Sequence, residues 1–358
     1  MPQAIIASPP ESFAARLVRW QGEHGRHDLP WQNTRDPYRI WVSEIMLQQT
    51  QVSAVIGYYD RFMQRFPDVA SLAAASADEV MRHWAGLGYY SRARNLHRAA
   101  GLVMSVHGGV FPQSQEALEA LPGIGRSTAA AIRSFAFGAR AAILDGNVKR
   151  VFARHAGIAG YPGAQKIEKQ MWQMAEERLP QAGLESYIQG LMDLGATLCT
   201  RTRPRCGDCP VAADCVARLE SRTAELPTPK PRGELPQREA TMLVLMHGGA
   251  VLLEKRPPVG IWGGLWSLPQ ADDDAGARKL AQTLGADWTS RESLRVIEHG
   301  FTHYHLSIKP LLLSAVPAPG VAEEGWVWLP LAQAHDAALP SPVKKLLTGL
   351  AAGTPLFG

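Results

Sequence analysis

The stretch LPGIGRSTAAAI, residues Leu121–Ile132, joins a Gly-x-Gly turn to an alanine-rich run that is typical of a helix. A short helical segment precedes it, so the pattern predicts two helices and a tight hairpin over residues 116–137. Gly123 and Gly125 allow positive φ and a close approach of the backbone to a ligand. The exposed amides of the turn, with the N-terminus of the next helix, suit a phosphate. A simple tight turn is the alternative.

Helical periodicity extends on both sides of this stretch. Apolar residues recur at three- and four-residue spacing, and Gly and Pro separate the segments. We therefore expect an all-α domain over residues 10–217. Its expected helices are Glu11–Glu23, Tyr38–Phe66, Ala77–Trp84, Arg92–His107, Ser127–Phe137, Asn147–Gly157, Ala164–Leu179 and Leu184–Thr197.

The composition and the pattern of the sequence change after this helical part. Residues 218–238 are rich in proline and charge and poor in apolar side chains, which is typical of a linker. Residues 239–352 then carry short strand patterns and two helical patterns, which predict an α+β domain. The expected strands are Thr241–Met246, Ala250–Lys255, Leu294–His299, His305–Leu313 and Trp326–Leu329, and the expected helices are Arg278–Leu284 and Val343–Leu350.

Composition and charge narrow the class of protein. With 46% hydrophobic and 20% charged residues, the 358-residue chain is globular and not disordered. The net charge of +4 falls within residues 1–217, which fits a polyanionic partner as well as an ordinary solvated surface. No apolar run is long enough for a membrane-spanning helix, and the N-terminus lacks a secretory signal pattern. We expect a cytoplasmic, nucleoid-associated protein that does not bind membranes.

Four cysteines cluster in one short loop, residues 199–215. The spacing Cys199-x6-Cys206-x2-Cys209-x5-Cys215 brings four thiolates together, as a 4Fe–4S cluster or a tetrahedral zinc ion requires. Only one CxxC pair is present, whereas zinc sites usually have two. We therefore expect one 4Fe–4S cluster with a structural role, with zinc or free thiols as the alternatives. Three arginines within the loop predict a basic lobe.

Two carboxyl groups lie in contrasting sequence environments. Glu44 sits inside the apolar helical run WVSEIMLQQTQV, where burial raises a carboxyl pKa and suits a general acid. Asp145 follows an apolar run and precedes Gly146 in AAILDGNVKRVFAR, so it is expected to cap a helix. Backbone N–H groups and the helix dipole favour its ionised form. The alternatives are a solvent-facing Glu44 and an Asp145 that only caps.

Together, Glu44 and Asp145 form a pair whose surroundings drive the two groups toward opposite protonation states. Cleavage of a glycosidic bond through an oxocarbenium-like sugar uses such a pair. One group protonates the leaving base, and the other stabilises positive charge on the sugar.

These motifs, in this order, resemble the MutY family of adenine DNA glycosylases, within the endonuclease III superfamily. The hairpin resembles the helix–hairpin–helix DNA-binding element, and the cysteine spacing resembles the 4Fe–4S loop of that superfamily. The resemblance covers about residues 10–350. Further matching stretches are LPWQ (Leu29–Gln32), GLGYYSRARNLH (Gly86–His97), YIQGLMDLGATLCTR (Tyr187–Arg201) and RPPVGIWGGLWSLPQ (Arg256–Gln270).

The resemblance implies roles for single residues. Glu44 is expected to protonate ring nitrogen 7 of adenine and later to activate water, and Asp145 to stabilise the transition state. Gln189 and Trp31 match the adenine pocket, with Gln32 beside it. Gln48 and Tyr89 match residues that wedge into the base stack. Core packing is the alternative for Tyr89 and Trp31, and a polar helix face for Gln48 and Gln189.

Ser127 indicates the subclass of glycosylase. Members of the superfamily that also cut the backbone carry a lysine nucleophile at this hairpin position, and serine cannot form a Schiff base. We therefore expect a monofunctional enzyme in which water attacks the sugar. Lys149 lies close to Asp145 in sequence and could trap an abasic aldehyde, but a phosphate contact is the expected role.

The C-terminal domain resembles a Nudix fold without the Nudix chemistry. An active pyrophosphohydrolase needs a carboxylate-rich helix of the type REUxEExGU to hold magnesium. The chain has QADDDAGARKLAQTLGA in its place. We expect a recognition module that reads 8-oxoguanine through Phe301-Thr302-His303, where the family commonly has Phe-Ser-His. An ordinary strand-end loop is the alternative.

The resemblance thus implies a monomeric glycosylase that binds double-stranded DNA and excises adenine mispaired with 8-oxoguanine, and with guanine. Three rival functions are a bifunctional lyase of the endonuclease III type, an inactive damage sensor and a Nudix hydrolase. Ser127 opposes the first, the retained pair Glu44 and Asp145 opposes the second, and the absent magnesium helix opposes the third.

Overall fold

The structure is a computed structural model that describes residues 11–231, 233, 235–258, 260–301, 303–316 and 325–353. The chain folds into two compact units. Unit 1 comprises Met1–Ala73 and Arg98–Arg232, and unit 2 comprises Ala74–His97 and Gly233–Gly358. Unit 2 thus includes one segment that the sequence assigns to the helical domain; the domain boundaries drawn from the sequence stay a prediction.

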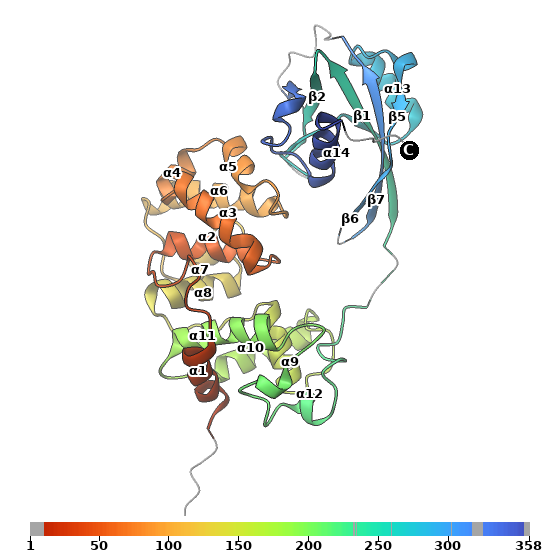
Figure 1. The fold of residues 1–358 in the computed structure, drawn as a ribbon. Coiled ribbons are helices and arrows are strands. Elements are labelled where there is room, and N and C mark those ends of the chain that lie inside the picture. The colour runs from red at the N-terminus through yellow and green to blue at the C-terminus, as the bar shows by residue number, and fades with distance from the viewer. Residues whose placement is uncertain are drawn as a thin grey trace, which may run out of the picture. The chain divides into compact units, whose positions relative to one another are not determined.

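Helices dominate the chain up to residue 219 (Figure 1). Their positions agree with the periodicity of the sequence to within a few residues in most cases. They are α1 (Phe13–His24), α2 (Pro37–Leu47), α3 (Val52–Arg65), α4 (Val69–Ala74), α5 (Ala77–Trp84), α6 (Ser91–His107), α7 (Gln115–Glu119), α8 (Arg126–Phe137), α9 (Gly146–His155), α10 (Gln165–Glu177), α11 (Leu184–Asp193) and α12 (Val216–Leu219).

A continuous hydrophobic core holds α1, α8, α9, α10 and α11 together in unit 1. On α9, for example, Val148, Val151, Phe152 and His155 follow helical spacing and are all buried. Leu17 of α1 is fully buried in the same core. This packing fixes the N-termini of α8 and α9 and the exposed face of α11, on which the candidate active site is built.

The single helix expected over Tyr38–Phe66 was wrong, because the structure breaks it into α2 and α3. Gln48 ends α2, and Gln49 adopts the left-handed φ of 58°. The intervening residues 48–51 are the polar run Gln-Gln-Thr-Gln, without the Gly or Pro that would mark a break in the sequence. The break turns this polar run toward a cleft, whereas a continuous helix would have spread it around its surface.

The helix expected over Leu184–Thr197 also changes form at its end. It is an α-helix over α11 and then a π-helical turn over Leu194–Leu198, which leads directly into the cysteine loop. Such π-turns are frequent at functional sites because they redirect side chains within a helix.

Unit 2 contains a mixed eight-stranded sheet. Its order is β3-β2-β1-β7-β5, with β4 beside β1, β6 beside β7 and β8 beside β2. The strands are β1 (Gln237–His247), β2 (Ala250–Lys255), β3 (Trp266–Ser267), β4 (Gln270–Ala271), β5 (Glu292–Ser293), β6 (Ile297–Gly300), β7 (His305–Ser314) and β8 (Trp326–Pro330).

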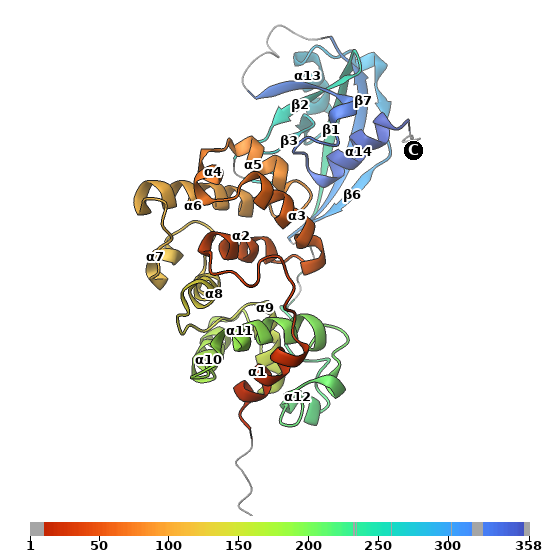
Figure 2. The same ribbon diagram turned by 60° about the vertical axis from the view of Figure 1, so that its left-hand side comes forward.

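The centre of this sheet is buried on both faces. β1 and β7 pair in parallel, with Gln237 opposite His305, and residues 240–245 of β1 are buried without interruption. A strand covered on both sides has this continuous apolar pattern. The helices α13 (Asp274–Thr283) and α14 (Ser341–Ala351) lie on different sides of the sheet (Figure 2), which completes the expected α+β architecture.

Among the described residues, no helix combines the length and the apolar character that a membrane crossing requires.

Candidate active site

Unit 1 contains a large cleft of about 1740 Å³. Binding sites for small molecules usually measure 300–1,000 Å³, so this cleft has room for more than one nucleotide. It is lined by the loop before α2, by α2 and residues 48–53, and by the starts of α8 and α9, α11 and the π-turn. Seven of the predicted site residues line it: Trp31, Gln32, Glu44, Gln48, Ser127, Asp145 and Gln189.

Glu44 is carried into this cleft by α2. The helix begins at Pro37, and the Asp36 side chain accepts the N–H of Tyr38 at 2.9 Å to cap it. Ile40 and Trp41, one turn before Glu44, are buried, and Glu44 itself is half-buried and lines the cleft. Burial, with a smaller contribution from the negative charge of Asp145, raises the pKa of Glu44 to about 8. The sequence prediction of a raised pKa agrees with this value.

Asp145 caps α9, as the sequence predicts. Its side chain accepts the N–H of Val148 at 2.8 Å. The net direction of its pKa differs from the expectation, because burial raises it more than the opposing contacts lower it. Those contacts are the backbone hydrogen bonds from Val148 and Asn147 and the charges of Arg150 and Lys149. The hydrogen bonds of the cap therefore offset part of the rise in the Asp145 pKa that burial causes, without reversing it.

The two carboxyl groups are electrostatically coupled, since the charge of Asp145 helps to raise the pKa of Glu44. With a pKa of about 8, Glu44 holds its proton at neutral pH, while the two backbone hydrogen bonds that Asp145 accepts favour the ionised form of Asp145. A proton donor and a fixed negative charge in one cleft can protonate a leaving group and stabilise a neighbouring cation.

The hairpin between α7 and α8 forms at the expected residues. Gly123 has a φ of 83°, which only glycine adopts readily, whereas Gly125 has a φ of −98° and serves as the N-cap of α8. Of the two glycines that allow positive φ, only Gly123 therefore uses it. Its Cβ position faces open space, so glycine leaves the approach to the α8 N-terminus uncovered. Gln48 lies near this turn, with its amide nitrogen 3.5 Å from the oxygen of Gly123.

Ser127 and Lys149 have local partners. The Ser127 hydroxyl accepts the backbone N–H of Leu144 at 3.0 Å, directly before Asp145. Lys149 forms an ion pair with Glu168 of α10 at 2.7 Å, and it is not among the residues that line the cleft. The serine thus supports the segment that carries Asp145, while the lysine ammonium is engaged away from the cleft.

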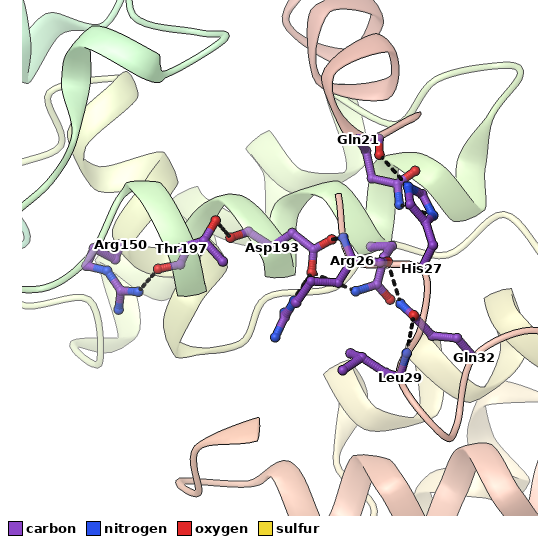
Figure 3. A network of polar contacts seen from close by, with 10 residues as sticks. Gln21, Arg26, His27, Leu29, Gln32, Arg150, Asp193 and Thr197 are labelled. Carbon is purple, nitrogen blue, oxygen red and sulfur yellow. Dashed lines mark hydrogen bonds and ion pairs between the residues drawn. The ribbon is translucent and has the colours of Figure 1, made fainter. Parts of the chain in front are cut away.

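The predicted adenine-pocket residues differ in how free their side chains are to contact a base. Trp31 is buried and packs edge-on against Tyr59, with ring centroids 5.3 Å apart. Gln32 uses both ends of its amide within its own loop: the oxygen accepts the N–H of Leu29 and the nitrogen donates to the oxygen of Arg26 (Figure 3). Gln32 therefore shapes the loop, and a direct contact with a base would require it to give up these bonds.

Gln189 belongs to a buried polar network that the sequence analysis missed. Its amide nitrogen donates to Asp193 at 2.8 Å, and Asp193 also binds Arg26 (Figure 3). The four-residue spacing of Gln189 and Asp193 on one helix was a usable signal. The contribution of Arg26, 167 positions away, left no local trace.

The four cysteines surround a second, smaller cavity in unit 1. Burial raises the pKa of the Cys209 thiol to about 11, and the other three thiols add to the shift. Arg154, itself buried, donates to Cys199 Sγ at 3.4 Å and to the Thr200 oxygen at 2.6 Å. Among the described residues, no group of three or more His, Cys, Asp and Glu side chains is arranged to hold a single metal ion.

The cysteine loop is connected to the cleft through Arg150. Its Nε donates to the Cys199 oxygen at 2.7 Å, and its Nη2 donates to Asn147 Oδ1 and to the Gly195 oxygen, both at 2.7 Å. Asn147 also provides one of the backbone N–H groups that Asp145 accepts. Folding of the loop therefore bears on the position of Asp145.

The remaining predicted residues belong to unit 2. Tyr89 is 44% exposed and has a positive φ of 49°, with the Arg92 guanidinium 5.4 Å from its ring. Phe301 and His303 lie in the loop between β6 and β7, where Phe301 stacks on Tyr304 at 4.7 Å. Thr302 lies outside the described residues.

Comparison with solved structures places the helical part in a known fold. A thermostable thymine-DNA glycosylase aligns with a TM-score of 0.54 at 31% identity, over 58% of this chain and 95% of that chain. Endonuclease III in a non-covalent complex with DNA aligns with a TM-score of 0.50 at 20% identity, over 58% and 94%. The second likeness shows a shared fold.

Comparison with protein families and curated proteins extends over both domains. Residues 42–177 match the HhH-GPD superfamily base excision DNA repair protein family, and residues 240–349 match the NUDIX domain. The adenine DNA glycosylase of Buchnera aphidicola subsp. Acyrthosiphon pisum is 34% identical over 337 residues, which cover 94% of this chain and 96% of the relative. That of Homo sapiens is 33% identical over 401 residues, covering 94% and 73%. The chain therefore belongs to the adenine DNA glycosylase family, with a helix–hairpin–helix domain followed by a Nudix-like domain.

Proposed function

We propose that this protein binds double-stranded DNA and excises adenine mispaired with 8-oxoguanine, and with guanine, by acid-catalysed hydrolysis of the N-glycosidic bond. The observation that carries the proposal is that Glu44 and Asp145 line the same cleft, which is large enough for a nucleotide. The pKa of Glu44 there is about 8. An acid works best when its pKa lies near the operating pH.

The chemistry runs in two steps. Glu44 donates its proton to ring nitrogen 7 of the extruded adenine, the bond from the sugar to the base breaks, and the base leaves with the bonding electrons. Positive charge develops on the sugar and is stabilised by the negative charge of Asp145. Glu44, now ionised, takes a proton from water as the water oxygen bonds to the sugar carbon, which restores the acid.

The nucleophile in this proposal is water. The Ser127 hydroxyl is engaged with the Leu144 N–H, and the Lys149 ammonium is paired with Glu168. Serine has no amine, and the lysine amine is engaged outside the cleft, which favours a monofunctional glycosylase over a lyase.

The partner base is a second requirement, because adenine itself is a normal base. Extruding it costs on the order of a few kcal/mol, less in a mismatch. We assign recognition of 8-oxoguanine to the loop of unit 2 that holds Phe301 and His303. Its aromatic cluster, with Phe301 stacked on Tyr304 and edge-on to His299 at 4.6 Å, offers a preformed surface for a base.

We assign a 4Fe–4S cluster to the four cysteines, because all four line one cavity and a cubane takes one thiolate on each iron. Cys199, Cys206, Cys209 and Cys215 would hold it. When bound, the cluster supplies structural cross-linking of the loop. The chain's own contribution is the buried Arg154, whose hydrogen bonds to the Cys199 thiol and to the loop carbonyls hold the ligands in place.

Single-turnover excision tests the proposal. The substrates are duplexes with adenine opposite 8-oxoguanine, guanine, cytosine or thymine, and the proteins are the wild type and Glu44→Gln. We expect fast release of adenine opposite 8-oxoguanine and no release by Glu44→Gln, although that variant still binds the duplex. Near-normal turnover by Glu44→Gln would overturn the acid assignment, and equal rates across the four duplexes would overturn the assigned specificity.

A further inference from the structure

The orientation of the Gln189 amide is imposed by a buried carboxylate. Asp193, one helical turn later on α11, is 1% exposed and accepts the Gln189 Nε2 at 2.8 Å. A carboxylate in an ion pair can only accept hydrogen bonds, so the amide must turn its NH2 group toward Asp193. The acceptor-only carboxylate of Asp193 therefore fixes the positions of the oxygen and the nitrogen of the Gln189 amide.

Asp193 is itself held rigidly. Arg26 donates to it from the backbone N at 2.9 Å and from Nε at 2.7 Å, and Arg26 Nη2 lies 2.6 Å from the same carboxylate (Figure 3). The backbone oxygen of Asp193 accepts the hydroxyl of Thr197 at 2.8 Å. A carboxylate anchored through both oxygens cannot turn to follow a rotation of Gln189.

This leaves the Gln189 carbonyl oxygen as the free end of the amide. Gln189 is half-buried and lines the cleft that holds Glu44, and no residue in the described part of the chain donates to its oxygen. The edge of adenine that carries N7 also carries the N6 amine, which is a donor, whereas guanine has the acceptor O6 at that place. A fixed carbonyl oxygen matches the first and repels the second.

We propose that Asp193 is a positioning residue for base specificity: it locks the Gln189 amide so that an acceptor faces the 6-position of the extruded purine. The inference rests on the proposed placement of adenine in this cleft. In Asp193→Asn, the new side-chain NH2 can donate to Gln189, so that the Gln189 amide turns and presents its own NH2 to the base. Recognition of the amine is then lost while the acid Glu44 is untouched.

The test compares adenine with unsubstituted purine, which lacks the 6-amine, in otherwise identical duplexes under single-turnover conditions with the full chain. We expect Asp193→Asn to lower the ratio of the adenine rate to the purine rate by about 10-fold, the effect of one hydrogen bond. The matched control Asp60→Asn, at an exposed aspartate of α3, should leave the ratio unchanged. The double variant Gln189→Glu with Asp193→Asn restores an acceptor and should recover the ratio.

A purely structural role for Asp193 predicts a different result. Loosening of the Arg26 loop would slow both substrates equally, and an unchanged ratio in Asp193→Asn would overturn the inference. Gln189→Leu keeps the pair of Asp193 and Arg26 and provides the test if Asp193→Asn does not fold; an unchanged ratio there would also overturn it. Failure of the wild type to release adenine from any of the duplexes, in contrast, would overturn the proposed function itself, and an active Glu44→Gln would overturn only the acid assignment.

Discussion

Replacement of Glu44 by glutamine should stabilise the protein at neutral pH while removing its acid. Folding raises the pKa of Glu44 from 4.5 to about 8, first through burial and second through the charge of Asp145. The stability that this group contributes is fully present below pH 4.5 and is lost as the pH rises through 8. The reason is that the folded state keeps a proton that the unfolded chain has already released.

The magnitude follows from this pKa difference. Between the two pKa values the free energy of unfolding falls by about 1.4 kcal/mol for each pH unit. The accumulated loss is about 3 kcal/mol at pH 7 and levels off at about 5 kcal/mol above pH 8. Glutamine carries no charge at any of these pH values, so the stability advantage of Glu44→Gln should grow from about zero at pH 4.5 to about 3 kcal/mol at pH 7. Asp145, which stays in place, contributes equally to both proteins as long as its own titration is unchanged.

Urea unfolding followed by far-ultraviolet circular dichroism between pH 5 and pH 8.5 measures this difference. Glu116→Gln, at an exposed glutamate of α7, is the matched control and should run parallel to the wild type. If the difference between Glu44→Gln and the wild type stays constant across this range, the carboxyl group is not held protonated by its surroundings, and the reasoning fails.

Three further changes have distinct expected outcomes. Asp145→Asn should slow base removal by about 100-fold or more through loss of electrostatic stabilisation; it should also move the alkaline limb of the pH–rate profile to lower pH, because the Asp145 charge helps to raise the pKa of Glu44. A change within a few-fold would leave Asp145 only its capping role. Ser127→Ala should lower the free energy of unfolding by about 1 kcal/mol in a denaturant titration, because the Leu144 N–H loses its acceptor; equal stability would mean that water replaces the hydroxyl. Cys209→Ala should abolish the brown colour and the bound iron of the purified protein, and full iron content would contradict the ligand assignment.

Much of the site could be predicted because its residues act through local sequence. Glu44 lies in an apolar helical run, which suggests a raised pKa but leaves a solvent-facing Glu44 open; the fold decides between the two. Asp145 caps the helix that follows it, but its net pKa direction depends on how much of the fold covers it, which a capping pattern does not report. The break after Gln48 could not be predicted, because no Gly or Pro marks it in the sequence. Tertiary packing outweighs the continuous helical pattern there.

The polar network around Gln189 was beyond sequence analysis for a different reason. The four-residue spacing places Asp193 beside Gln189 on one helix. Arg26, which holds Asp193 in place, lies 167 positions earlier in the sequence. Interactions between residues distant in sequence arise from the assembled fold and leave no periodicity.

The hydrogen bond from the Leu144 amide to the Ser127 hydroxyl also bears on evolutionary change within the superfamily. An ammonium group donates hydrogen bonds but has no lone pair with which to accept one, so lysine at this position offers no acceptor to that amide beside Asp145. A lineage that gains strand-cleaving chemistry by one replacement here therefore starts from a weakened hairpin. A new acceptor for the Leu144 amide, from a side chain or from water, would restore that stability.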